Sequence, residues 1–371
     1  MQLNESLAHQ IVSRAMKILS FSVNVMDESG LIIASGNPER IHQRHEGAVL
    51  ALTENRVVEI SEATALQLKG VRPGINLPIS YQGELLGVIG ISGDPEEVRA
   101  YAELVRMTAE LIMEQAALTE QLQWDKRHKE ELVLQLIRGE GRVDQLQQAA
   151  RFLGLDLAQP RVVAVLALEE ADPARLRELV HQLENPERDN LVAIHGLDEI
   201  VVLKPAQLCD GVWQSDQERN RIKQLLARIP HFKVHIAVGD YFAGIDGLTR
   251  SYQTARDTLR RGMRQAPRKQ VYFFEDYRLP VLLGSLMDSW QADQLRTPLQ
   301  RLAKEDSKGA LQKTLRHYFL QDCDLHRCAE ALFIHPNTLR YRLGRIEQIT
   351  GLNFNKLDDK FQLYLGLNLS M

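Results

Sequence analysis

The feature that most constrains the fold is a long stretch, residues 96 to 138, that contains neither glycine nor proline. Asp94 is a good N-cap before it, Pro95 suits the first helical position, and two glutamates follow in the first turn. The stretch therefore predicts a single helix over residues 95–138. Because a helix of that length is seldom an isolated surface element, we expect it to pair subunits, to transmit a signal, or both.

The sequence on either side of this helix predicts a multidomain α+β protein. The first 94 residues begin with an amphipathic helix and continue with two hairpin patterns, with helical segments at 40–54 and 61–69 between them. Strands and helices then alternate over residues 150–276, which predicts an α/β domain, and the remaining residues are helical in pattern. The predicted boundaries are 1–94, 95–138 for the long helix, 139–276 and 277–371.

Composition places the chain among soluble globular proteins, with 44% hydrophobic and 25% charged residues. Three scattered cysteines do not make a disulfide framework, and neither a signal peptide nor a membrane span is visible. These features predict a cytoplasmic protein with no membrane partner. The net charge of −4 is unevenly distributed: residues 299–371 contain 11 Lys and Arg against 8 Asp and Glu, or +3, so the preceding part carries −7. A modestly basic C-terminal module fits localised contact with phosphate groups.

Two short helices are predicted near the C-terminus. Asp324 caps a first helix that runs to about Phe333, with Ala329, Leu332 and Phe333 on its buried side. The sequence "IHPN" ends it, because the residue before proline disfavours helix. A second helix begins near Asn337 or Thr338 and ends at Gly351. Helix, turn and helix over about 324–350 is the DNA-reading supersecondary motif.

The second of these helices has two distinct faces at helical spacing. Its core stripe is predicted to consist of Leu339, Leu343 and Ile346. The residues that point away from this stripe or flank it, and that we predict to contact DNA, are Asn337, Thr338, Arg340, Tyr341, Arg342 and Arg345. The same residues also fit a solvated amphipathic helix with three exposed arginines.

Cysteine and histidine residues gather in the same region, at Cys323, His326, Cys328 and His335. Their spacing fits no standard zinc pattern, and helical core cysteines explain them as well. We therefore predict neither a metal site nor a cofactor.

Two stretches of the first domain carry candidate binding residues, "ASGNPERIHQRHEGA" and "VRPGINLPI". Their glycines permit close approach of a ligand to backbone N–H groups, and their arginines can bind carboxylates in a bidentate fork. A small dianion would suit two such donor clusters. Turn glycines beside solvent-facing arginines fit the same spacing.

Both ends of the chain resemble one family of bacterial regulators. The C-terminal stretch "ALFIHPNTLRYRLGRIEQITGLNF" resembles the purine-catabolism-regulator type of helix-turn-helix, within which His335 and Asn337 shape the turn. The N-terminal blocks "GLIIASGNPERIHQRHEGA" and "GVRPGINLPISYQGELLGVIGISG" resemble the sugar diacid recognition domain. The whole is similar to the carbohydrate diacid regulators, transcriptional activators that respond to glucarate, galactarate or glycerate. Departures are Asn37 where Asp is common and His42 where Gly is common; if His42 lines the pocket, its ring alters the pocket's shape.

The resemblance implies a PAS- or Cache-like α+β sensor at the N-terminus, binding of operator DNA, and a homodimer or higher homo-oligomer. It implies that Arg40 and Arg72 pair with carboxylates, and that His45, Ser35 and Asn76 form hydrogen bonds with carboxylate or hydroxyl oxygens. The full set of ligand contacts that it implies is Ser35, Arg40, His45, Gly47, Arg72, Gly74, Ile75 and Asn76.

The middle domain is similar to the degenerate nucleotide-cyclase-like domain of these regulators. The Gly-Gly-Asp/Glu-Glu-Phe turn of active cyclases is missing, and in its place stands "IHGLDEIVVL", where we interpret Asp198 and Glu199 as ordinary turn residues. We predict no turnover. The rival hypothesis is an enzyme, either a cyclase or a hydrolase that uses His42, His45 and a nearby acid, but no nucleophile motif or phosphate loop supports it. A pure interaction module would leave the C-terminal motif unexplained.

Overall fold

The computed structural model describes residues 3–68, 71–170, 172–184 and 189–369, and divides into two compact units, Met1–Lys126 and Arg127–Met371. Each unit is described by itself. Within the described ranges, no helix is both long and apolar enough to cross a membrane.

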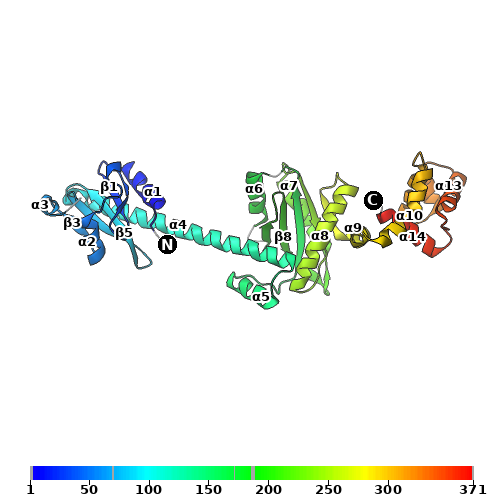
Figure 1. Ribbon diagram of the computed structural model, residues 1–371, viewed down its shortest axis with the longest axis horizontal. Helices are drawn as coiled ribbons and strands as arrows, with labels where there is room; N and C mark the ends of the chain where they lie inside the picture. The colour runs from blue at the N-terminus through cyan, green and yellow to red at the C-terminus, as the bar shows by residue number, and fades with distance from the viewer. Residues whose placement is uncertain (1–2, 69–70, 171, 185–188, 370–371) are drawn as a thin grey trace. The chain divides into compact units, whose positions relative to one another are not determined.

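The first unit is built on a five-stranded antiparallel sheet in the order β2-β1-β5-β4-β3 (Figure 1). Both predicted hairpins are confirmed, since β1 pairs with β2 and β4 pairs with β5. The strands are β1 (Val23–Met26), β2 (Ile32–Ser35), β3 (Val58–Ile60), β4 (Gly74–Tyr81) and β5 (Glu84–Ser92). The helices are α1 (Glu5–Met16), η1 (Pro38–Arg40), α2 (Glu46–Glu54), α3 (Glu62–Ala65) and the first part of α4 (Pro95–Arg138).

Apolar side chains cover both faces of this sheet. On one face, side chains such as Val25 and Leu77 pack with α1 and with α4 residues such as Val98. On the other face, Met26 and Val88 pack with α2. A polar side chain in the middle of these strands is therefore buried on either face, and it needs a hydrogen-bond partner there.

The helix predicted at 40–54 begins six residues later, at Glu46. The preceding segment instead runs beside the start of β2: the His42 N–H donates to the Ile32 carbonyl, and the Ile32 N–H donates to the Gln43 carbonyl. The prediction of helix over 61–69 reduces to the single turn α3 because a turn follows Ala65, and residue 69 lies outside the described residues.

The long helix is confirmed as α4, Pro95–Arg138, with its first turn capped by Asp94, whose Oδ1 accepts the Glu96 N–H at 3.0 Å. Its early turns belong to the core of the first unit, and its last turns, with Leu132 and Leu136, belong to the core of the second. Several large apolar side chains between these two parts are exposed, among them Leu118 and Leu122.

The second unit contains a five-stranded sheet in the order β12-β11-β6-β8-β7, in which only the β11–β12 pair is parallel among the described strands. Helices α6 and α7 cover one face, and α5, α8 and the end of α4 cover the other (Figure 1). The strands are β6 (Arg161–Leu168), β7 (Leu191–Ile194), β8 (Glu199–Pro205), β11 (Val234–Val238), β12 (Val271–Phe273) and the small pair β9 (Leu208–Cys209) and β10 (Val212–Trp213). The helices are α5 (Val143–Phe152), α6 (Pro173–Leu183), α7 (Ser215–Arg228) and α8 (Ile245–Gln265).

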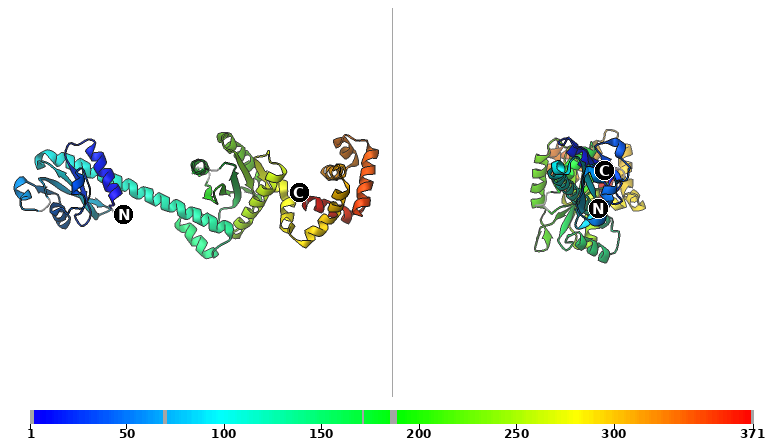
Figure 2. Two further views of the ribbon diagram at one scale, coloured as in Figure 1. Left: turned by 45° about the horizontal axis from the view of Figure 1, so that its top comes forward. Right: turned by 90° about the vertical axis from the view of Figure 1, so that its left-hand side faces the viewer.

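The C-terminal part of this unit is helical, as predicted (Figure 2, yellow to red). It has its own core around Leu315, Leu339 and Leu363. It follows α9 (Phe274–Leu282) and the short helix η3 (Leu283–Leu286). Its helices are α10 (Trp290–Glu305), α11 (Ala310–Leu320), α12 (Leu325–Ala331), α13 (Pro336–Thr350) and α14 (Leu357–Leu369).

Candidate functional site

A row of polar residues crosses the sheet of the first unit. Strand register places Asn24 of β1 opposite Ser35 of β2 on one side and opposite Gly90 of β5 on the other, and Gly90 in turn lies opposite Asn76 of β4. Ser35, Asn24 and Asn76 are all buried. The Ser35 hydroxyl donates to Asn24 Oδ1 at 2.6 Å and accepts the Asn37 N–H at 2.9 Å. The strand neighbours of Asn24 and Asn76 face α1 and α4, so this polar row faces α2.

The start of α2 lies over this row. His45 is its N-cap, with Nδ1 accepting the Ala48 N–H at 3.1 Å. A Cβ atom at Gly47 would come within 3.0 Å of Asn76 Nδ2 and 3.1 Å of His45 Cε1. Glycine at position 47 therefore lets the first turn of α2 approach Asn76 closely. Since Nδ1 of His45 is an acceptor, its Nε2–H remains a donor.

Positive charge collects at the same place. Burial, together with repulsion from Arg72, lowers the pKa of the buried Arg40. Burial, followed by repulsion from Arg40, lowers the pKa of His45 to about 4. His45 is therefore neutral at pH 7, and Arg72 disfavours the charged form of Arg40. A bound anion would remove that repulsion.

Asn76 adds a hydrogen-bond acceptor to this cluster. Its Oδ1 is buried and accepts no hydrogen bond from the protein. An unsatisfied buried acceptor costs about 1–3 kcal/mol, which a ligand hydroxyl could recover by donating to it. The arrangement as a whole can therefore receive a molecule that carries both carboxylate and hydroxyl groups.

The structure brings together most, but not all, of the ligand contacts expected from the sequence. Arg40, His45, Gly47, Arg72 and Asn76 are linked by the contacts and charges described above. Ser35 lies farther along the polar row, and its hydroxyl is already bonded to Asn24 and to the Asn37 N–H. The Ile75 side chain instead belongs to the core on the opposite face of the sheet. Gly74 faces backbone, since a Cβ atom there would lie 2.1 Å from the Ile91 carbonyl oxygen. His42 is exposed, with φ of 66°, a left-handed conformation that suits the glycine common at this position.

Sequence reasoning missed Asn24 and Gly90. Asn24 holds the Ser35 hydroxyl, and Gly90 leaves room beside Asn76, because a Cβ atom there would come within 3.0 Å of Asn76 Oδ1. The available signal was one amide residue within the otherwise apolar strand "VNVM". Recognising it required the strand pairing.

Helices α12 and α13 form the predicted helix-turn-helix, with two corrections at the turn. The first helix, α12, ends at Ala331, and Phe333 is 95% exposed rather than buried. Phe333 adopts φ of 54°, and Ile334 closes the helix by donating its N–H to the Ala329 carbonyl, so the Phe333 side chain turns outward. The second helix, α13, starts at Pro336 with His335 as N-cap, because proline favours the first helical position.

The predicted core stripe of α13 is confirmed, since Leu339, Leu343 and Ile346 are buried. The residues on its outer side that are exposed are Asn337, Thr338, Arg340, Tyr341 and Arg345. Arg342 differs from them: it is half-buried, and its Nη1 donates to Thr314 Oγ1 of α11 at 3.2 Å. α13 thus offers one continuous polar and cationic face, with Arg342 at its edge.

In the hairpin β7–β8, Glu199 is more than a turn residue. Its Oε1 lies 3.0 Å from His195 Nδ1 and accepts the Tyr252 hydroxyl at 3.2 Å. The interpretation of Glu199 as an ordinary turn residue was therefore wrong, because the chain turn occupies residues 196–198 and Glu199 opens β8 facing α8. Asp198 does lie exposed in the turn.

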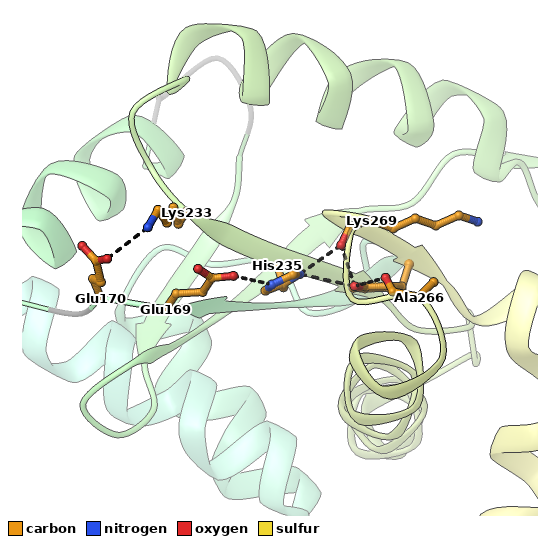
Figure 3. Close-up of polar contacts among 7 residues, drawn as sticks. Glu169, Glu170, Lys233, His235, Ala266 and Lys269 are labelled. Carbon is orange, nitrogen blue, oxygen red and sulfur yellow. Dashed lines mark hydrogen bonds and ion pairs between the residues drawn. The ribbon is translucent and has the colours of Figure 1, made fainter. Parts of the chain in front are cut away.

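The carboxylates that follow β6 are also engaged (Figure 3). Glu169 Oε1 lies 3.0 Å from His235 Nε2, while His235 Nδ1 lies 3.0 Å from the Lys269 carbonyl oxygen. Glu170 pairs with Lys233 at 3.1 Å. This network joins β6, β11 and the segment before β12. In the part of the chain that the structure describes, no three His, Cys, Asp or Glu residues are grouped to hold a metal ion.

Comparison with known families finds three matching segments. Residues 3–136 match the sugar diacid recognition family, residues 138–261 match the GGDEF-like domain family, and residues 311–369 match the PucR C-terminal helix-turn-helix family. A sensor-type domain combined with a helix-turn-helix defines a DNA-binding transcriptional regulator.

Whole-length relatives narrow this class further. The chain is 45% identical to the carbohydrate diacid regulator of Escherichia coli K12 over 376 residues, which cover 99% of this chain and 98% of that protein. It is 49% identical to an uncharacterized protein of Haemophilus influenzae over 99% of both chains. It is 29% identical to the uncharacterized protein YsfB of Bacillus subtilis over 99% of this chain and 98% of the relative. The chain belongs to the carbohydrate diacid regulator family.

Proposed function

We propose that this regulator activates genes for the uptake and catabolism of carbohydrate diacids, and that a small diacid bound to the first unit controls it. The observation that carries the proposal is the cluster of Arg40, Arg72 and neutral His45 beside the unpartnered Asn76 Oδ1. Two cations, an N–H donor and a free acceptor match a molecule with carboxylates and hydroxyls. The Escherichia coli relative carries the name carbohydrate diacid regulator.

Each group in the cluster has a distinct part in binding. Arg40 and Arg72 each pair with a carboxylate through the guanidinium fork. His45 donates from Nε2 to a carboxylate or hydroxyl oxygen, and Asn76 Oδ1 accepts from a hydroxyl. Gly47 keeps the start of α2 close enough for all four groups to reach one ligand. Glucarate and galactarate offer a carboxylate at each end with hydroxyls between, and glycerate offers one carboxylate and two hydroxyls.

On the DNA side, the exposed face of α13 enters the major groove. Asn337, Thr338 and Arg340 near its N-terminus contact base edges, while Tyr341 and Arg345 contact bases or phosphates. One reading helix makes few contacts. We therefore propose a dimer that binds two half-sites about 34 Å apart.

The middle domain has a structural or dimerising role and no turnover. Glu199, Glu169 and Glu170 are committed to His195, His235 and Lys233 within the fold, which supports this role over that of an enzyme. Diacid binding biases two arrangements of the first unit, and α4 carries the difference. The size of the effect is limited by the ligand's differential affinity for those arrangements.

Calorimetry of the full chain with glucarate, galactarate and glycerate tests the effector site. Arg72→Ala should weaken binding of the effector by about tenfold or more, because a charge-assisted hydrogen bond contributes about 1.5–3 kcal/mol. Arg44→Ala is the matched control, since Arg44 is an exposed arginine of the same unit outside the cluster. Equal heats for Arg72→Ala and the unaltered protein would refute the site.

A second arm tests the acceptor role of Asn76. Adipate has the chain length and both carboxylates of glucarate but no hydroxyls, so it should bind more weakly than glucarate. In Asn76→Leu that difference should shrink, because the variant has no acceptor for a ligand hydroxyl. An undiminished preference for glucarate in this variant would show that the hydroxyls are recognised elsewhere.

A further inference from the structure

A second candidate site lies in the other unit, where α8 meets α9 and η3. A cavity of about 450 Å³ opens there, within the range of small-molecule sites. One wall is the face of α8 that carries Arg260, Arg261 and Arg264, and the opposite wall includes Val281 and Met287. Positions 257, 260, 261 and 264 recur at helical spacing, so four charged residues of one helix face line the same space.

The charges around this cavity do not balance. Three arginines line it against two carboxylates, Asp257 and Asp288, which leaves one positive charge in excess. Asp257 lies 3.9 Å from Arg260, its nearest guanidinium partner here. Arg260 and Arg264 are exposed, so they can move toward a ligand without breaking the fold.

Arg261 is the unusual member of the group. It is only 7% exposed, and its Nε is buried without a hydrogen-bond partner. Its Nη2 donates to the carbonyl oxygen of Asn368, and no ion pair with a carboxylate of the described chain compensates its charge. Burial and then repulsion from Arg264 lower its pKa. A buried guanidinium without a counter-ion is costly, and an anion beside it would relieve that cost.

We propose that this cavity binds a small oxyanion-bearing metabolite, with its phosphate or carboxylate group held by Arg260, Arg261 and Arg264 and its body against Val281 and Met287. Planar guanidinium groups suit both kinds of oxyanion, and the apolar wall suits a compact carbon skeleton. This site shares no residue with the diacid cluster of the first unit. It is a second input to the regulator.

The position of Arg261 indicates which part of the protein such a ligand would affect. The Asn368 carbonyl that it holds belongs to the last turn of α14, the helix that closes the DNA-binding bundle. The Leu369 carbonyl at the same helix end accepts Arg296 Nε at 3.2 Å. Two arginines thus stabilise the negative end of the α14 dipole. An anion that draws on Arg261 changes one of these two contacts and so couples the cavity to the DNA-binding domain.

The test is calorimetry on the full chain with inorganic phosphate, 3-phosphoglycerate and glucarate, at ionic strength held constant with sodium chloride. Arg260→Gln/Arg264→Gln removes the two exposed cations and keeps the buried Arg261. Arg250→Gln/Arg268→Gln is the matched control, because both arginines are exposed and neither lines the cavity. We expect at least one probe to bind, with affinity reduced about tenfold or more in the cavity variant and unchanged in the control.

The probes separate the two oxyanion sources. Binding of a phosphate probe alone identifies a phosphate site, and cavity-dependent binding of glucarate identifies a carboxylate site. The proposal fails if no probe binds below about 10 mM, or if the two double variants bind alike. Arg72→Ala should leave cavity binding intact. Loss of all binding in that variant would assign the heats to the first unit and overturn the second site, whereas failure of diacid binding alone would leave it standing.

Discussion

His45 shows how one residue combines a local and a tertiary role. Its Nδ1 caps α2 by accepting the Ala48 N–H, a contact that only the unprotonated nitrogen can make. Burial and then Arg40 oppose a proton on this ring, as does the positive end of the helix dipole. The fold around Arg40 and His45 therefore favours the neutral imidazole.

This state makes the stability of the first unit depend on pH. The pKa of His45 is about 4 in the folded chain against 6.5 for the ordinary side chain. Between these values the unfolded chain binds more protons, so the free energy of unfolding falls as pH falls from 6.5 to 4. The loss should approach about 3 kcal/mol over the whole window.

Urea unfolding followed by circular dichroism at pH 7 and pH 4.5 measures the effect, with His45→Asn for comparison. Asparagine can still cap α2 but does not titrate in this range. Lowering the pH from 7 to 4.5 should therefore reduce the free energy of unfolding more for the unaltered chain than for the variant. A difference that stays constant with pH would contradict the proposed state of His45.

At the scale of elements, one face of α13 is packed in the helical core and the opposite face is exposed. Leu339, Leu343 and Ile346 anchor it in the helical core, and Arg342 ties its side to Thr314 of α11. The outer face is left to make contacts with another molecule. Exposed polar residues on a rigidly anchored helix are what base reading needs, since their positions are defined before binding.

Thr338→Ala/Arg345→Ala should weaken operator binding by about tenfold or more, because each base contact contributes about 1–3 kcal/mol. Gel shifts at one fixed salt concentration measure this. Lys223→Ala on α7 serves as the control for loss of an exposed positive charge outside the bundle. Undiminished binding by the double variant would show that another face reads the DNA.

At the same scale, Phe333 and the start of α2 show where prediction from the local sequence fails. Because the helical periodicity continues through Phe333, we predicted that its side chain lies in the core. The left-handed backbone conformation at this residue instead turns the side chain outward. The start of α2 was predicted too early for a related reason. Residues 40–45 have helical propensity, yet pairing beside β2 satisfies their backbone groups instead.

For the whole molecule, the exposed face of α4 bears on assembly. Leu104, Leu111 and Leu118 are 58%, 63% and 58% exposed and recur every seven residues. Leucines at one heptad position favour pairing with a second copy of the same helix. The opposite side of these turns is already buried in the first unit, so this face is available for the dimer proposed above.

Leu111→Glu/Leu118→Glu should convert the dimer to monomers, because the buried seam would then contain four charges. Light scattering coupled to size-exclusion chromatography measures the mass. Operator affinity should fall with it, since each monomer reaches one half-site. Leu197→Glu is the control, a leucine 88% exposed in the β7–β8 turn. An unchanged mass for the double variant would place the dimer contact elsewhere.

The sequence by itself determined the features that short windows encode. Asp94 and Pro95 predicted the start of α4, and the turn residues predicted both hairpins. The stripe at Leu339 and Leu343 predicted the buried side of α13. Caps, turns and periodicity act within a few residues, so their physical cause is present in the local sequence.

Tertiary structure alone decided which distant groups share one environment. Asn24, Ser35 and Asn76 form a row only because the strand register aligns them, and Ile75 leaves that row because its side chain alternates to the other face. Arg261 becomes a buried cation at a cavity only where α8 meets α14. Burial, register and charge compensation depend on residues far apart in the chain, and no local window contains them.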